Sequence, residues 1–192
     1  MDIFKKEHPY WALFYHHEGY EMDGDRLMGR QAAGNSFLRA LVQDNPDTLG
    51  IYIKNNEQKE LAKKTISSFL SIDQEININA IPFVRPYESQ LFGGIFLPGP
   101  SISESALARG FYSHNQYSLV GITHTTASHN VMTGISDLLT SPVMPWDGVI
   151  CTSNVVADTL SHVIDETFDQ LKFYLGASKR QLPQFPIIPL GV

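Results

Sequence analysis

The hydrophobic positions of the chain fall into short runs rich in Ile, Val, Leu and aromatic residues, and longer stretches with helical spacing separate these runs. This alternation is typical of a parallel β-sheet that helices cover on both faces. The pattern predicts strands at 11–16, 50–54, 76–83, 91–97, 118–123, 148–152 and 185–189, and helices at 28–43, 57–70, 101–112, 131–141 and 153–175. We therefore expect a single three-layer, Rossmann-like α/β domain with a mostly parallel sheet over residues 1–192.

Local signals predict how two of these helices begin. Ser101 and Glu104, which follow Pro98-Gly99-Pro100, have the spacing of a capping box. Ser153 stands directly before the last long helix, where its hydroxyl would satisfy backbone N–H groups. For Ser153 this structural role outweighs a functional one.

Composition narrows the class of protein further. A chain of 192 residues with 43% hydrophobic residues and a net charge of −6 is large enough to bury a full core, which rules out disorder as its main description. Between Lys64 and Lys172 the only basic residues are Arg85 and Arg109, so the chain has no basic track for a phosphate backbone. We expect no nucleic-acid partner.

The lone cysteine and the N-terminus indicate the cellular compartment. Cys151 excludes an internal disulfide, and its apolar neighbours Val149 and Ile150 are typical of a buried strand rather than of a reactive thiol. The first six residues lack the apolar run of a signal peptide, and no stretch approaches the roughly 20 apolar residues that span a bilayer. The sequence therefore predicts a cytoplasmic protein.

Polar residues that follow the first predicted strand form the first candidate site, because ligands of parallel sheets bind at the carboxyl ends of the strands. They are His16, His17, Glu18 and Tyr20, and an acidic loop then leads to Gly29, Arg30 and Gly34. A glycine near a helix N-terminus allows a phosphate to approach backbone N–H groups. The glycine spacing does not match the dinucleotide fingerprint, which argues against an NAD-dependent oxidoreductase. The alternative is that Gly29 and Gly34 serve tight helix–strand packing and that Arg30 is a surface charge.

The second candidate site lies where the strand at 118–123 ends. His124 leaves this strand directly and is flanked by hydroxyl residues, of which Thr125 comes next. A histidine in this place can form a hydrogen bond with a sugar hydroxyl or a reacting oxygen. A purely structural histidine is the alternative, and His129 is a weaker candidate because loop histidines are usually solvated.

Four features in this order resemble the N-terminal half of a retaining, family 4-type (group 1) glycosyltransferase of the GT-B fold. They are the glycine-bearing loop after the first strand, the pair His124-Thr125, the motif Ser-x-x-x-Ala-x-x-Leu at 153–160, and Pro189-Leu190-Gly191-Val192, which marks the crossing into the second domain of that family. Each motif is loose, but together they span the whole chain. The chain ends on this apolar run, so we expect a C-terminal domain to follow.

The resemblance implies a two-domain hexosyltransferase that moves a sugar from a nucleotide-sugar to a sugar or lipid-linked acceptor with retention of configuration. The absent C-terminal domain would hold most of the nucleotide-sugar, and this chain would hold the acceptor. The isolated chain would then be inactive. The resemblance also implies that no metal or cofactor is needed, because helix N-termini and basic side chains would stabilise the leaving diphosphate.

The resemblance assigns roles to individual residues. His124 matches the family histidine that contacts the donor sugar and is needed for transfer, and Thr125 would lie beside the donor. The adjacent Gly-Gly pair of the family is absent, so Gly29 and Gly34 are alternative candidates for the approach to the diphosphate, together with Arg30. The acceptor candidates are His16, His17, Glu18 and Tyr20.

Two alternatives stay open at this point. The chain is either half of an enzyme or a stand-alone Rossmann-like binding or interaction module without catalysis, in which His124 is structural. The helix at 57–70 carries Lys59, Lys63 and Lys64 mostly opposite its apolar side, as helices at a membrane surface do. Any surface helix that packs on a sheet shows the same pattern. Peripheral membrane contact and ordinary packing of a surface helix are therefore both open interpretations.

Overall fold

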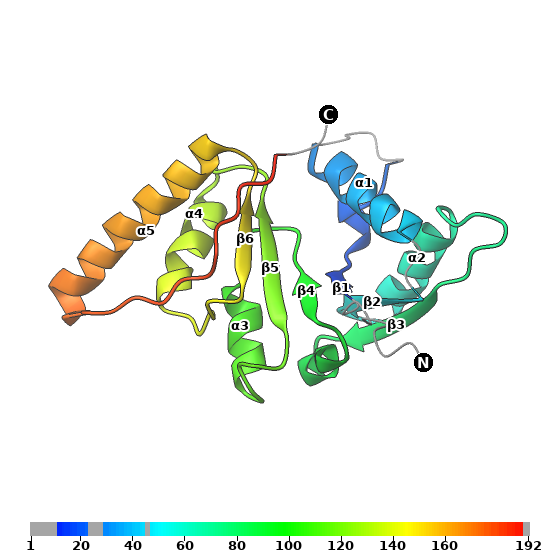
Figure 1. Ribbon diagram of the computed structural model, residues 1–192, viewed down its shortest axis with the longest axis horizontal. Coiled ribbons are helices and arrows are strands. Elements are labelled where there is room, and N and C mark those ends of the chain that lie inside the picture. Colours follow the sequence, from blue (N-terminus) through cyan, green and yellow to red (C-terminus); the bar gives the residue numbers. More distant parts are fainter. Residues whose placement is uncertain (1–10, 23–28, 45–46, 190–192) are drawn as a thin grey trace, which may run out of the picture. The chain divides into compact units, whose positions relative to one another are not determined.

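The computed structural model describes residues 11–22, 29–44 and 47–189 (Figure 1). The chain divides into two compact units, Met1–Phe96 and Leu97–Val192, which we call the N-unit and the C-unit. The strand pairings within each unit are parallel, and helices connect the strands. This confirms the predicted α/β class and the parallel sheet of a Rossmann-like fold.

In the N-unit, the elements follow the predicted alternation of strand and helix. They are β1 (Trp11–Phe14), the 3-10 turn η1 (His17–Gly19), α1 (Gly29–Gln43), β2 (Thr48–Ile53), α2 (Asn56–Ser67), β3 (Asn77–Pro82), the 3-10 helix η2 (Pro86–Leu91) and β4 (Gly94–Phe96). The strands lie in the order β3-β2-β1-β4, and Leu13 of β1 is opposite Ile51 of β2 and Phe96 of β4. The strand predicted at 91–97 is shorter than expected: η2 includes residue 91, and β4 spans only Gly94–Phe96.

One face of the N-unit sheet forms its core. Successive residues of a strand point to opposite faces. Leu13 of β1, Ile51 of β2 and Tyr15, which directly follows β1, pack into one cluster with Leu38 of α1 and Ile66 of α2. Both helices therefore cover the same face, as consecutive right-handed crossovers require.

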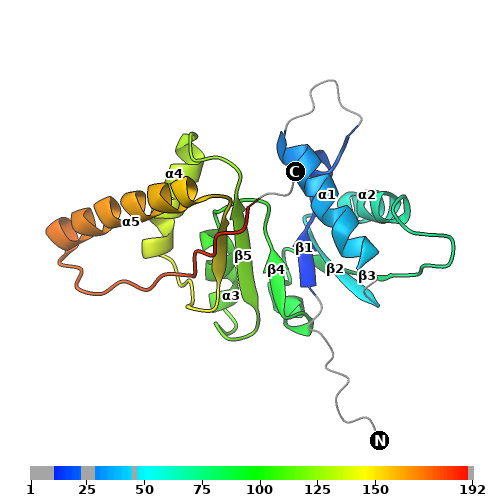
Figure 2. The same cartoon turned by 45° about the horizontal axis from the view of Figure 1, so that its top comes forward.

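In the C-unit, the elements again alternate. They are α3 (Ser103–Gly110), β5 (Ser118–Thr123), α4 (His129–Ser136), the 3-10 turn η3 (Asp137–Leu139), β6 (Gly148–Cys151) and α5 (Asn154–Leu175). β5 and β6 pair in parallel from Val120 and Gly148 to Thr123 and Cys151. Helices α4 and α5 lie side by side in both views (Figures 1 and 2). Cys151 is buried as predicted, and burial raises the pKa of its thiol.

The cap predicted for α3 is wrong, whereas the cap of α5 is confirmed. α3 begins at Ser103, and no side-chain hydrogen bond caps it. A turn in which the N–H of Ile102 donates to the Pro100 carbonyl delays the helix, and the Ser101 hydroxyl packs instead against Gly134 of α4. For α5, the Ser153 hydroxyl accepts a hydrogen bond from the N–H of Val156 at 3.3 Å.

The last predicted strand, 185–189, is reduced to two isolated bridges beside β6. The N–H of Val149 donates to the Gln184 carbonyl and that of Cys151 to the Pro186 carbonyl, each at 2.8 Å. Prolines at 183, 186 and 189 interrupt this segment, and proline has no N–H to donate. A continuous ladder is therefore not formed.

No helix in the described part of the chain is both long enough and apolar enough to cross a bilayer.

Candidate functional site

The first candidate site lies in the N-unit, where β1 ends in the turn η1. Helix α2 holds this turn from one side, because the Gln58 side-chain oxygen accepts a hydrogen bond from the N–H of His17 at 2.8 Å. Helix α1 holds it from another, because the Asn35 side-chain amide donates to the Tyr20 carbonyl at 3.0 Å. The residues after β1 therefore have one defined backbone course.

Gly34 explains how α1 approaches η1 so closely. It is an interior residue of α1, and a Cβ atom placed on it would overlap the Gly19 carbonyl. Gly34 therefore allows close packing of α1 against the turn η1, where the packing alternative predicts a strand. Gly29 opens α1 and is exposed, and no described atom lies within 4 Å of where its Cβ would be. The Arg30 side chain lies outside what the structure describes, as does the acidic loop at 23–28.

Tyr20 is placed in the core. Only 3% of it is exposed, and its ring stacks on that of Tyr15 with a centroid distance of 4.9 Å. Its hydroxyl donates a hydrogen bond to the Phe14 carbonyl at 2.6 Å, and burial raises the pKa of Tyr20 well above its ordinary value. The structure therefore gives Tyr20 a structural role, where the sequence predicts an acceptor contact.

The three other acceptor candidates differ in how firmly they are held. His16 and Glu18 are exposed, and their side chains approach each other only to 4.0 Å. His17 is half-buried, and its Nδ1 atom lies 3.1 Å from the Tyr15 hydroxyl. Of the three, His17 has the side-chain position best defined by neighbouring groups.

The second candidate site lies in the C-unit, at the carboxyl ends of β5 and β6. The Thr152 hydroxyl donates to the Thr123 carbonyl at 3.1 Å, which ties the ends of the two strands together. The Ser128 hydroxyl accepts a hydrogen bond from Val131 N–H at 3.3 Å and so caps α4. Because Ser153 caps α5, two serine-capped helix N-termini follow these strand ends.

His124 is the first residue after β5 and is half-buried. Burial lowers the pKa of this imidazole below its ordinary value, which favours the neutral form of the ring. Within the described residues, no hydrogen bond joins its side chain to another group. A neutral imidazole offers one donor and one acceptor nitrogen, both suited to hydroxyl groups. Thr125, the next residue, is exposed.

The sequence-predicted residues thus form two groups, one in each unit. His16, His17 and Glu18 gather at η1 in the N-unit, and His124 with Thr125 follows β5 in the C-unit. Nowhere in the described ranges do three or more His, Cys, Asp or Glu side chains gather in a way that could hold a metal ion.

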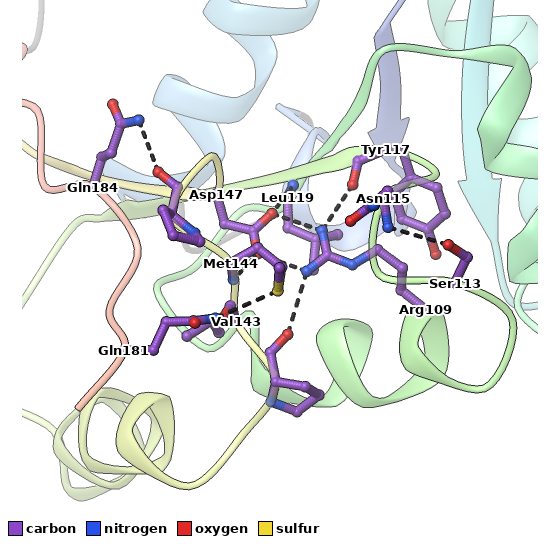
Figure 3. Close-up of polar contacts among 12 residues, drawn as sticks. Arg109, Ser113, Asn115, Tyr117, Leu119, Val143, Met144, Asp147, Gln181 and Gln184 are labelled. Carbon is purple, nitrogen blue, oxygen red and sulfur yellow. Dashed lines mark hydrogen bonds and ion pairs between the residues drawn. The ribbon is translucent and has the colours of Figure 1, made fainter. Parts of the chain in front are cut away.

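A buried ion pair in the C-unit is the main polar feature that the sequence interpretation missed (Figure 3). Arg109 and Asp147 are both fully buried, and two parallel N–H···O contacts of 2.7 Å join the guanidinium to the carboxylate. The carboxylate also accepts hydrogen bonds from the N–H groups of Leu119 and Met144, each at 2.8 Å. Arg109 donates further to the Tyr117 carbonyl at 2.7 Å. With both charges enclosed in this way, the pair is structural.

The helical spacing gave a signal for one half of this pair. Ile102, Ala106 and Arg109 are separated by four and three residues, which places Arg109 on the buried side of α3. Nothing in the local sequence marks Asp147 as its partner.

Comparisons with known proteins add little. No family model matches the chain, and no curated protein is significantly similar to it. Among solved structures, it is similar to an entity described as the X-ray structure of Pen from Bacillus thuringiensis, with 12% identity and a TM-score of 0.32. The match covers 92% of this chain and 50% of that one, so the chain spans about half its length. A likeness this distant carries no argument about function.

Proposed function

We propose that this chain is the acceptor-side domain of a glycosyltransferase that moves a sugar from a nucleotide-sugar to an acceptor hydroxyl with retention of configuration. The observation that carries the proposal is the position of His124, a half-buried imidazole directly after β5 whose ring has no hydrogen-bond partner in the described part of the chain. The order of the junction motifs, which resembles that of family 4-type enzymes, supports it.

In this proposal, the His124 ring contacts a hydroxyl of the donor sugar. A neutral ring can donate one hydrogen bond and accept another, whereas a protonated ring can only donate. Because burial lowers the pKa of His124, the neutral form is favoured at physiological pH. The nucleotide and its diphosphate would be held mainly by a C-terminal domain of the same polypeptide.

Sugar transfer by the full reading frame that encodes this chain tests the proposal. We expect His124→Ala to lower kcat by about 10²- to 10³-fold, the usual effect of removing a hydrogen-bond partner that acts at the reacting centre. His129→Ala is the matched control, because His129 is exposed on α4 and should be replaceable without loss. Activity of His124→Ala near that of wild type would contradict the assignment.

Calorimetry on the isolated chain is a second test. Because most nucleotide-sugar contacts are assigned to another domain, residues 1–192 alone should bind a nucleotide-sugar weakly or not at all. Tight binding would be inconsistent with an acceptor-side half. If the full reading frame transferred no sugar at all, a stand-alone binding module would be the better description.

A further inference from the structure

A chain of hydrogen bonds runs from η1 through β1 into α2. Nδ1 of His17 lies 3.1 Å from the Tyr15 hydroxyl oxygen, which lies 2.9 Å from Oγ1 of Thr65. Oγ1 of Thr65 is in turn 3.1 Å from the carbonyl oxygen of Leu61, one turn earlier in α2. Tyr15 is 1% exposed, so water does not replace its partners.

The last member of this chain sets the direction of every bond. A carbonyl oxygen can only accept, so Thr65 donates its single hydroxyl hydrogen to Leu61. Oγ1 of Thr65 must then accept the hydrogen of Tyr15. With that hydrogen committed, the Tyr15 oxygen can only accept from His17, which requires the hydrogen of the neutral imidazole to be on Nδ1.

We propose that this series of hydrogen bonds holds His17 as the Nδ1–H tautomer. The Nε2 lone pair of His17 is then available to accept a hydroxyl hydrogen of a neutral, polyhydroxylated acceptor. The inference rests on the proposed function for its biological meaning, although the tautomer itself does not. Tyr15 and Thr65 are positioning residues here, because they act only through the histidine.

The neighbouring Gln58 supplies the complementary group. Its side-chain oxygen is occupied by the N–H of His17, which fixes the amide, while its NH₂ group has no hydrogen-bond partner among the described residues. Two polar groups of His17 and Gln58 thus form no hydrogen bond within the described residues, namely the Nε2 acceptor of His17 and the NH₂ donor of Gln58. A sugar hydroxyl both donates and accepts, so it suits this pair, whereas an anion would meet the lone pair of Nε2 unfavourably.

¹⁵N NMR on this protein under basic conditions, where imidazole rings are neutral, measures the tautomer. The His17→Gln variant assigns the signals. We expect a protonated Nδ1 and a bare Nε2 in the wild type. Thr65→Val removes the group that receives the Tyr15 hydrogen, so Tyr15 can donate to Nδ1 and the tautomer should invert to Nε2–H. Thr65→Ser keeps the hydroxyl and should retain the wild-type spectrum.

Either of two results would overturn the inference: a bare Nδ1 in the wild type, or an unchanged tautomer in a folded Thr65→Val variant. If that variant does not fold, the wild-type and Thr65→Ser spectra still decide. Titration with methyl β-glucopyranoside should shift the Nε2 signal of the wild type and leave that of Thr65→Val in place. A larger shift of the Nε2 signal with inorganic phosphate, or no shift with the glycoside, would contradict a neutral acceptor at His17.

These readouts separate the two proposals. A confirmed tautomer in a protein whose full reading frame transfers no sugar would refute the glycosyltransferase and keep His17 as a hydroxyl-binding residue. Full transfer activity together with a bare Nδ1 of His17 in the wild type would refute the inference about His17 and keep the glycosyltransferase.

Discussion

The two units bury polar side chains in different ways. Next to η1, the N-unit buries the neutral hydroxyls of Tyr15 and Tyr20, and each hydroxyl has a hydrogen-bond partner within the unit. The C-unit encloses a full ion pair, Arg109 with Asp147, at zero exposure. Neutral groups cost less to remove from water, and a hydroxyl chain can reverse its direction when one member changes. An ion pair has one arrangement of donor and acceptor. It can therefore fix the surrounding loops, but its hydrogen bonds cannot reverse direction.

The ion pair links segments that are distant in the sequence of the C-unit. The guanidinium of α3 reaches the segment before β5 through the Tyr117 carbonyl, and the carboxylate reaches β5 and the loop before β6 through Leu119 and Met144. Of the buried side-chain N and O atoms of Arg109 and Asp147, only Nε of Arg109 has no hydrogen-bond partner among the described residues. We infer that the pair fixes the base of the unit, at the opposite strand ends from His124.

The largest effect should come from breaking the ion pair. Arg109→Met leaves the Asp147 charge buried without its counter-charge, and we expect the free energy of unfolding to fall by about 3–5 kcal/mol. Urea denaturation measures this loss. The double variant Arg109→Met with Asp147→Asn should lose less than the two single variants combined, because the uncompensated charge is gone. Additive losses would show that the charges do not interact as the geometry requires.

The next effect should come from crowding η1 in the N-unit. Gly34→Ala puts a Cβ atom onto the Gly19 carbonyl, and overpacking of this kind costs about 1–3 kcal/mol, against which alanine regains about 1 kcal/mol of helix propensity. Thermal unfolding measures the balance, which we expect to be destabilising. Gly29→Ala is the matched control in the same helix, since no described atom opposes it, and should not destabilise. Equal behaviour of the two variants would contradict the close contact.

A smaller effect is expected from a neutral hydrogen bond of the N-unit. Tyr20→Phe keeps the stacked ring and removes the hydroxyl that donates to the Phe14 carbonyl. A net loss of about 0.5–1.5 kcal/mol in the free energy of unfolding is typical for such a bond. A loss as large as that of Arg109→Met would erase the distinction between the two units.

The smallest effect concerns His124 and pH. Because burial lowers its folded-state pKa, the unfolded chain binds a proton more readily, with a pKa of about 6.5. The contribution of neutral His124 to stability is therefore complete above pH 6.5 and declines as pH falls toward the folded-state pKa. Denaturation of wild type and His124→Gln across this range should show a shallower acid decline in the variant. A parallel decline would mean that His124 is not desolvated.

The sequence predicted the regular elements well where strong local signals exist. The strand Ser118–Thr123 and the Ser153 cap of α5 both stand where the hydrophobic run and the hydroxyl place them. Prediction failed where a local signal competed with a turn, as with the cap expected from Ser101. It also failed at 185–189, where prolines interrupt an otherwise strand-like run.

The candidate-site residues show the same difference between local sequence signals and tertiary contacts. A histidine at the end of a buried strand is visible in the sequence, so His124 could be singled out. The burial of Tyr20 could not, because a tyrosine in a polar turn looks exposed until its stacking on Tyr15 is known. The link from Tyr15 to Thr65 spans 50 residues, and that from Arg109 to Asp147 spans 38, so only the tertiary fold shows either.

The segment beside β6 has a consequence for how this protein behaves at high concentration. An exposed strand with a regular row of N–H and C=O groups is a template onto which another chain can add, and this is a common start of aggregation. Here, Gln184 and Ile188 donate their N–H groups on the β6 side, so the alternate residues form the other edge of the segment, and two of them, Pro183 and Pro189, have no N–H. Intermolecular strand addition at this edge is thereby discouraged while the protein stays folded.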